Sequence, residues 1–145
     1  MTSRPYFAYG SNLFEPQMSN RCPGTKILGR AQLRGWQFII NDWGVASIVK
    51  KPGAVVWGLV WDISAEHETT LDVFEGVAEG HYTKEQVSVR LIDETPKVTL
   101  NCLTYVSRNA FRGRSRPDYL DTRILPAAKK QRFPMAYQSQ LKRWI

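Results

Sequence analysis

The segment at residues 54–63, Ala-Val-Val-Trp-Gly-Leu-Val-Trp-Asp-Ile, constrains the fold more than any other part of the sequence. It is a nearly continuous apolar run rich in valine and tryptophan, and such runs are typical of strands that are buried on both faces. We therefore expect this segment at the centre of a β-sheet. It is far shorter than the stretch of about 18 apolar residues that a membrane-spanning helix needs, and no other stretch of the sequence approaches that length.

The rest of the chain divides into short strands and helices separated by prolines and glycines. Turns are expected at Pro52-Gly53 and at residues 93–96. Because strands mostly precede helices instead of alternating with them, the order predicts an α+β fold and not a doubly wound one. The predicted strands cover residues 5–9, 27–49 with breaks at Arg34-Gly35 and Asn41-Asp42, 84–92 and 98–106. The predicted helices cover residues 13–22, 65–74, 117–131 with an interruption at Pro126, and 134–144.

The composition predicts one domain with a core of its own. The chain has 145 residues, of which 43% are hydrophobic, and we expect a single domain over residues 1–145. The first residues lack the apolar run of a secretory signal, which favours a soluble, intracellular and cytoplasmic protein. Cys22 and Cys102 lie far apart and neither belongs to a Cys-x-x-Cys pair, so both are expected to be reduced and structural.

The chain is basic, with a net charge of +7 and an isoelectric point near 9.6. Its densest charge is the segment Arg108–Arg116, which holds four arginines and no acidic residue. A solvated loop is the commonest structure for such a segment, and contact with an acidic substrate or with nucleic acid are the alternatives. A basic isoelectric point reports on non-specific association more than on function, so it does not by itself favour nucleic acid.

Most familiar catalytic motifs are absent, and the two histidines are expected to be structural or exposed. Two segments are unusual. Residues 6–13 run from a buried strand into Gly10-Ser11-Asn12, a turn whose N–H groups can form an anion-binding nest. Residues 71–82 place Glu75 at a helix end beside Gly76, where burial would raise the pKa of a carboxyl group toward the range of a general acid or base. Asp72 and Glu79 compete with Glu75 for that role.

Taken together, these segments resemble the γ-glutamylcyclotransferases and related AIG2-like proteins. The opening motif is Tyr-Phe-Ala-Tyr-Gly-Ser-Asn-Leu at residues 6–13. Val-Trp-Gly-Leu-Val-Trp at residues 56–61 and Leu-Asp-x-x-Glu-Gly-Val at residues 71–77 follow in the family's order. Gly80-x-Tyr82, Pro117-x-Tyr119 and a Pro-x-x-Tyr-Gln motif at residues 134–138 also fit, so the resemblance covers nearly the whole chain.

The resemblance implies a small mixed sheet curled toward a barrel with flanking helices, and a defined reaction. The free α-amine of the substrate attacks its own γ-glutamyl carbonyl, which releases 5-oxoproline and an amine or amino acid without a cofactor or metal. Glu75 matches the family's catalytic glutamate. Tyr82 lies near that glutamate and is expected to orient it, with structural packing as the alternative. The residues that match substrate-binding positions are Tyr6, Phe7, Ala8, Tyr9, Gly10, Ser11, Tyr82 and Tyr119.

Several alternatives stay open at this stage. The chain could remove a γ-glutamyl protecting group from a biosynthetic intermediate, act on γ-glutamyl-ε-lysine, or be a non-catalytic module that binds γ-glutamyl ligands or nucleic acid. The expected partner is a small γ-glutamyl molecule and not a membrane, and the chain is expected to be a monomer or a homodimer. If the segment Arg108–Arg116 faces the substrate, it would favour a leaving group that carries a carboxylate.

Overall fold

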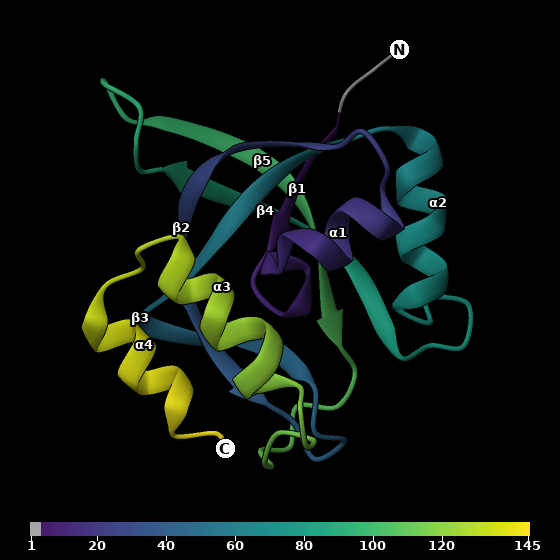
Figure 1. Cartoon of the computed structure of the whole chain (residues 1–145), viewed down its shortest axis with the longest axis vertical. Helices are drawn as coiled ribbons and strands as arrows, with labels where there is room; N and C mark the ends of the chain where they lie inside the picture. Colours follow the sequence, from purple (N-terminus) through teal and green to yellow (C-terminus); the bar gives the residue numbers. More distant parts are fainter. Residues whose placement is uncertain (1–3) are drawn as a thin grey trace.

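The strands form one closed barrel in the order β1-β3-β2-β4-β5 (Figure 1). The structure is a computed structural model that describes residues 4–145. Neighbouring strands pair antiparallel except β1 and β5, which run parallel and close the barrel at Tyr6 and Leu103. The α+β class and the curled mixed sheet are therefore confirmed. The strands are β1 (Arg4–Ala8), β2 (Lys26–Ile40), β3 (Ala46–Ile63), β4 (Tyr82–Leu91) and β5 (Val98–Ser107).

The apolar run at residues 54–63 forms the second half of β3 and is the centre of the sheet, as predicted. This strand pairs with β1 along one edge and with β2 along the other. Val56, Leu59 and Val60 are completely buried. Gly58 is required there because a Cβ at this position would lie 2.3 Å from the carbonyl oxygen of Ala8. The valine and glycine content of the run thus reflects close packing between β3 and β1.

The predicted strand at residues 27–49 contains a hairpin, and the predicted turn at Pro52-Gly53 is wrong. The chain reverses after Asn41, whose side-chain oxygen accepts hydrogen bonds from the N–H groups of Trp43 and Val45. Strand β3 then continues through Pro52 and Gly53. Its pairing with β2 skips from Lys50 to Val55, so residues 51–54 form a bulge. A bulge can hold a proline because the missing N–H is not needed in the ladder.

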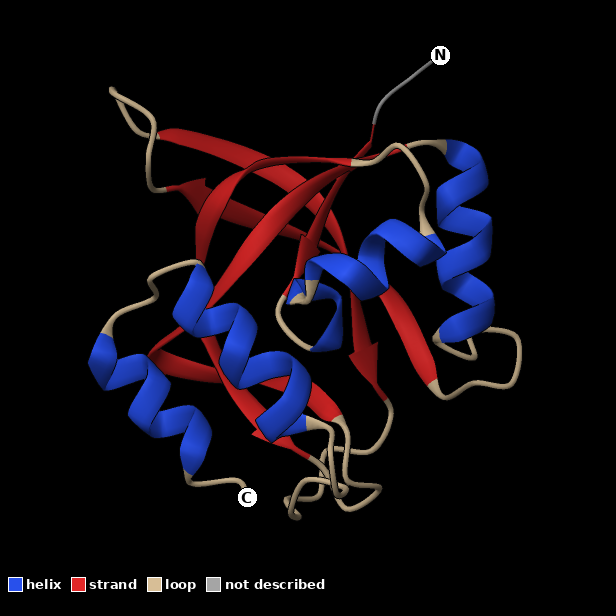
Figure 2. Ribbon diagram, in the orientation of Figure 1, coloured by secondary structure: helices blue, strands red, loops and turns tan. Residues whose placement is uncertain are grey.

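The helices flank the barrel in two groups. Figure 1 shows α3 and α4 lying together on one side and α1 and α2 on another, and Figure 2 separates these helices from the strands by colour. Among the described residues, none of the helices is long and apolar enough to cross a membrane. The helices are α1 (Glu15–Arg21), α2 (Ala65–Phe74), α3 (Leu125–Lys130) and α4 (Met135–Lys142), with a short 3₁₀ helix η1 (Ser11–Leu13) after β1.

The single helix predicted over residues 117–131 is wrong at its start. Asp118 has a positive φ of 59°, and a π-helical turn, η2 (Leu120–Ile124), precedes α3. Pro126 lies in the first turn of α3 and therefore begins that helix instead of interrupting it. A proline there costs little, because the first N–H groups of a helix have no partner within it.

Helix α2 has well-defined ends, and its C-terminal end positions the candidate site. Ser64 and His67 form a reciprocal capping box at its start, which gives His67 the structural role expected of it. Glu75 is the C-terminal cap and Gly76 follows with a φ of 63°. Both cysteines are buried and free, as predicted. The single domain over residues 1–145 stays a prediction, and residues 1–3 of it lie outside the described part.

Candidate active site

A small cavity joins the C-terminal end of α2 to the turn that follows β1. Its volume is about 40 Å³, which is comparable with the space of one water molecule. Its wall brings together seven of the residues assigned to the site by sequence. The lining residues are Tyr6, Tyr9, Gly10, Ser11, Asn12, Ala46, Glu75, Tyr82, Tyr105 and Tyr119.

Glu75 supplies the only carboxyl group among the residues that line this cavity. The C-cap position holds its backbone, whose N–H donates to the carbonyl oxygen of Leu71 at 2.8 Å. Burial raises the pKa of the Glu75 carboxyl group from its usual 4.5 to about 7, while the positive charge of Arg21 lowers that pKa. A pKa near neutrality lets the same group accept and return a proton at physiological pH.

Asp72 and Glu79, the two carboxylates that compete with Glu75 for the catalytic role, lie outside the cavity. Asp72 accepts a hydrogen bond from the hydroxyl group of Tyr105 at 2.7 Å and pairs with Lys84 at 3.0 Å. Glu79 is exposed. Neither lines the cavity. Of these three carboxylates, Glu75 is therefore the one that lines the cavity.

The turn after β1 forms one wall of the cavity. Within η1, Leu13 and Phe14 donate their N–H groups to the carbonyl oxygens of Gly10 and Ser11, both at 3.0 Å. The N–H groups of Gly10, Ser11 and Asn12 make no backbone hydrogen bond within the described residues. Such free N–H groups at the start of a helical turn attract negatively charged oxygen atoms.

The turn leaves little room for a side chain at position 10, which favours the glycine found there. A Cβ at Gly10 would lie 3.0 Å from the Cβ of Ala46 and 3.7 Å from the hydroxyl oxygen of Tyr119. The glycine therefore lets the first residue of β3 and a tyrosine approach the turn closely. Gly10, Ala46 and Tyr119 come from three separate parts of the chain, and all three line the cavity.

Asn12 connects the turn to neighbouring residues through several hydrogen bonds, a role that was not assigned from the sequence. Its side-chain amide donates to the hydroxyl oxygen of Tyr6 at 2.9 Å. Its side-chain oxygen accepts from Gln17 at 3.0 Å and from Arg21 at 3.2 Å, and its carbonyl oxygen accepts from the indole of Trp61 at 3.0 Å. The Tyr-Gly-Ser-Asn motif contains the signal for this role, because asparagine is both a donor and an acceptor.

Tyr82 does not orient Glu75 through a hydrogen bond. Its hydroxyl group donates to the carbonyl oxygen of Ala46 at 2.7 Å, and the N–H of Ala46 donates to the hydroxyl oxygen of Tyr119 at 3.1 Å. Burial raises the pKa of both tyrosines above the ordinary value, so both hydroxyl groups are protonated. The sequence does not indicate this role of Ala46, because the hydrogen bonds to the two tyrosines are made by its backbone and not by its side chain.

Phe7 and Ala8 do not reach the cavity. Both are completely or almost completely buried between the strands, and the carbonyl oxygen of Phe7 accepts from the hydroxyl group of Thr104 at 2.8 Å. Alternation along β1 places Phe7 on the opposite face from Tyr6, which accounts for its absence from the cavity. Ala8 shares the face of Tyr6 but does not line the cavity, whereas Tyr9 lines it although strict alternation would place Tyr9 on the face of Phe7. The break in alternation at Tyr9 occurs where β1 ends.

The segment Arg108–Arg116 also contributes no residue to the cavity. Arg112 instead donates to the side-chain oxygen of Gln37 at 2.8 Å, in a different groove. Arg116 donates to the carbonyl oxygen of Trp43 at 2.9 Å. Among residues 4–145, no cluster of three or more His, Cys, Asp or Glu side chains is arranged to hold a metal ion.

Comparison with known proteins places this barrel and its cavity in one family. A model of the AIG2-like family matches residues 55–141. The γ-glutamylcyclotransferase of Homo sapiens is 32% identical over 147 residues, covering 94% of this chain and 76% of the human protein. That of Mus musculus is 31% identical with the same coverage. The chain therefore belongs to the AIG2-like family. The relatives it matches there are γ-glutamylcyclotransferases.

Solved structures agree with this assignment. A γ-glutamyl cyclotransferase structure superposes with a TM-score of 0.89 at 28% identity, covering 99% of this chain and 89% of that one. YkqA from Bacillus subtilis superposes with a TM-score of 0.83 at 21% identity, covering 99% of this chain and 54% of that one. The second likeness concerns the fold alone.

Proposed function

We propose that this chain is a γ-glutamylcyclotransferase, which releases 5-oxoproline from a γ-glutamyl amino acid or amine, and that Glu75 is its proton shuttle. The observation that supports this most directly is that Glu75 and the turn at residues 9–11 line one cavity. The pKa of about 7 gives that group the proton affinity that the reaction needs.

The reaction moves two protons from the attacking nitrogen to the leaving nitrogen and needs no external nucleophile. The Glu75 carboxylate takes a proton from the substrate's α-ammonium group, and the freed amine attacks the γ-carbonyl carbon. A tetrahedral intermediate forms, with the charge on the former carbonyl oxygen. Glu75 then returns its proton to the leaving nitrogen, the carbonyl double bond re-forms, and the bond between that nitrogen and the γ-carbon breaks. The Glu75 carboxylate takes the second proton from the ring nitrogen, which completes the neutral lactam of 5-oxoproline, and passes it to the released amine, which departs as an ammonium group.

The fold's main contribution is to hold the substrate in a curled shape. Ring closure within one molecule has an effective concentration of about 10⁵ M or more when the reacting groups are well oriented. The N–H groups of Gly10, Ser11 and Asn12 are suited to bind the substrate carboxylate or the developing oxyanion. A catalytic site of this kind can therefore operate with a single titratable group.

Tyr119 and Tyr82 would contribute opposite hydrogen-bonding capacity. Tyr119 accepts from Ala46, so its own proton remains available for a substrate carboxylate. Tyr82 donates the hydrogen bond of its hydroxyl group to the carbonyl oxygen of Ala46, so a lone pair on its hydroxyl oxygen can accept from a substrate ammonium group. A γ-glutamyl group is larger than the cavity of about 40 Å³, so substrate entry would require the cavity wall to open.

The test is detection of 5-oxoproline by mass spectrometry after incubation with γ-glutamyl amino acids, γ-glutamyl amines and γ-glutamyl-ε-lysine. We expect product from at least one class, and the preferred class identifies the leaving group. Glu75→Gln should reduce turnover by about 10²-fold or more while preserving the fold. Asp72→Asn and Glu79→Gln are the matched controls and should remain active. Turnover by Glu75→Gln above about a tenth of wild type would exclude the shuttle role.

Failure of the whole panel would favour the rival interpretation as a binding module. In that case a γ-glutamyl ligand should still bind, which calorimetry with the same compounds would detect. A salt-dependent shift on mixed DNA or RNA would support the nucleic-acid version. We favour the enzyme, because a half-buried carboxyl group with a raised pKa has an energetic cost that a simple binding pocket does not need.

A further inference from the structure

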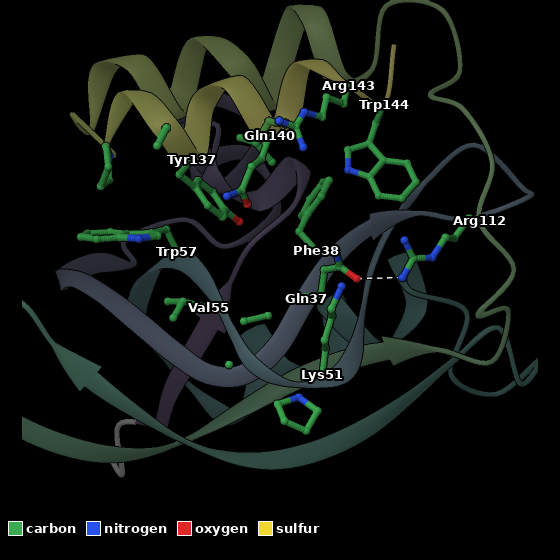
Figure 3. A pocket seen from close by; sticks show the side chains of 16 residues that line it. Gln37, Phe38, Lys51, Val55, Trp57, Arg112, Tyr137, Gln140, Arg143 and Trp144 are labelled. Carbon is green, nitrogen blue, oxygen red and sulfur yellow. Dashed lines mark hydrogen bonds between the residues drawn. The ribbon is translucent and has the colours of Figure 1, made fainter.

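A second and much larger groove lies on the side of the barrel that α4 covers. Its volume is about 760 Å³, within the range of small-molecule sites. It lies between α4, the end of β2 and the bulge of β3 at residues 51–54 (Figure 3). None of the residues that line the Glu75 cavity lines this groove, so the two sites are separate.

The two ends of the groove differ in chemistry. Figure 3 shows Trp57 and Val55 toward one end, and Arg112, Arg143 and Trp144 toward the other. The chain direction of α4 agrees, because the helix begins at Met135, beyond Pro134, and its C-cap is Arg143. One end of the groove is therefore apolar and aromatic, and the opposite end holds two arginines beside Trp144.

The positive charge of the groove is not balanced by its own walls. Lys51, Arg112 and Arg143 line it, and no aspartate or glutamate does. All three cationic residues are exposed. Unbalanced cations at the mouth of an apolar groove attract an anion from solution, and guanidinium groups bind carboxylates in a bidentate manner.

Contacts behind the walls hold the groove in shape. The ring of Trp57 lies 5.7 Å from the ring of Phe133, which lies 6.1 Å from the ring of Tyr137. At the cationic end, the N–H of Ser115 donates to the carbonyl oxygen of Trp144 at 2.8 Å. A preformed groove loses little conformational entropy when a ligand binds.

One buried polar group in the wall has no partner. Tyr137 is 5% exposed, and its hydroxyl group makes no hydrogen bond with the described residues. Figure 3 shows this side chain extending from α4 toward the space between Trp57 and Phe38. A buried hydroxyl group without a partner costs free energy, so such groups are rare where packing alone shapes the protein.

We propose that this groove binds a small aromatic carboxylate, with its ring against Trp57 and Tyr137 and its carboxylate between Arg112 and Arg143. The charge pattern argues against a second copy of this chain as the occupant, because the groove is cationic and the chain carries a net charge of +7. This inference does not rest on the proposed cyclotransferase activity.

The test is calorimetric titration of the full chain with 1-naphthaleneacetate and with its uncharged amide. The two probes share one ring system and differ in charge. We expect saturable binding of the carboxylate with one site per chain, and binding of the amide at least about tenfold weaker. Chemical-shift changes in an NMR titration should map to Trp57, Tyr137 and Trp144.

Two double variants distinguish specific binding in the groove from non-specific attraction of anions by a basic protein. Arg112→Ala with Arg143→Ala should weaken carboxylate binding by about tenfold or more. Arg4→Ala with Arg90→Ala removes the same charge on β1 and β4, at two positions that do not line the groove, and should leave the affinity unchanged. Equal weakening in both double variants, equal affinity for the two probes, or no binding up to about 1 mM would each overturn the proposal.

Discussion

Tyr82 donates a hydrogen bond from its hydroxyl group to the carbonyl oxygen of Ala46 over 2.7 Å. The N–H of the same alanine donates to the hydroxyl oxygen of Tyr119 over 3.1 Å. The carbonyl oxygen of Ala46 thus occupies the hydroxyl donor of Tyr82 and leaves its lone pairs unused. The N–H of Ala46 occupies a lone pair of Tyr119 and leaves its hydroxyl donor unused. Two chemically identical side chains acquire different roles in the cavity from their backbone partners.

The first prediction concerns this difference. Tyr119→Phe removes the free donor, so we expect KM to rise by about tenfold, as loss of a hydrogen bond to a charged group costs about 1.5 kcal/mol or more. Tyr82→Phe removes a bond within the protein, so it should lower the free energy of unfolding by about 1 kcal/mol. Steady-state kinetics and denaturant unfolding would measure the two effects.

Tyr137→Phe is the matched control for both variants. Its hydroxyl group is buried and makes no hydrogen bond, so its removal should leave KM unchanged and stability equal or slightly higher. A rise in KM for this variant as large as for Tyr119→Phe would contradict the assignment of the substrate contact to Tyr119.

The second prediction concerns Arg21, whose positive charge lowers the pKa of Glu75. Arg21→Gln should raise the pKa of Glu75 above about 7, because the carboxylate loses a favourable charge. NMR titration of the ¹³C-labelled carboxyl carbon measures this directly and does not involve the substrate's own amine. Arg4→Gln removes a charge that pairs with Glu68 on α2, and it should leave the Glu75 titration where it is. An unchanged titration in Arg21→Gln would rule out this coupling.

The third prediction concerns Asn12. Asn12→Ala removes the donor to Tyr6 and the acceptor for Gln17 and Arg21, so we expect a loss of about 2 kcal/mol in the free energy of unfolding. KM should also rise, because the turn loses its support. Asn101→Ala, at an exposed position on β5, should change neither quantity by much. A variant with normal stability and KM would show that the turn does not depend on this side chain.

The sequence predicts the local elements of this fold better than its closure. Strand β3 is recognisable from its apolar run, and α2 from Ser64 at one end and Gly76 at the other. The parallel contact between Tyr6 and Leu103 closes the barrel but joins residues far apart in the chain, and no local pattern encodes it. The barrel was expected only from the family resemblance. Pro52 was misinterpreted because a bulge and a turn have the same local signal.

The candidate site shows the same division. Glu75 and the turn at residues 9–11 carry side-chain and glycine signals, so the sequence points to them. Ala46 acts through its backbone, and nothing in an alanine indicates that role. Tyr105 lines the cavity and is only 2% exposed, so burial alone does not distinguish a residue of the cavity wall from a residue of the core.

The last prediction is that Glu75 makes the protein less stable at neutral and alkaline pH. An unfolded chain would ionise Glu75 near its usual pKa of 4.5, whereas the folded protein does so at about 7. Between these values the folded state binds a proton that the unfolded state has lost, so stability falls as pH rises through this window. Above it the full cost remains, about 1 to 3 kcal/mol, and below it the cost vanishes.

Glu75→Gln should therefore be more stable than wild type at pH 8 and equally stable at pH 4, although it is inactive. Thermal unfolding at both pH values measures this, and the difference at pH 8 should be several degrees for a chain of this size. Glu79→Gln makes the same chemical change at an exposed position and should show no such pH dependence. Equal stability of Glu75→Gln and wild type at pH 8 would mean that the carboxyl group is hydrated, and a hydrated carboxylate would be too weak a base to draw a proton from the substrate's ammonium group.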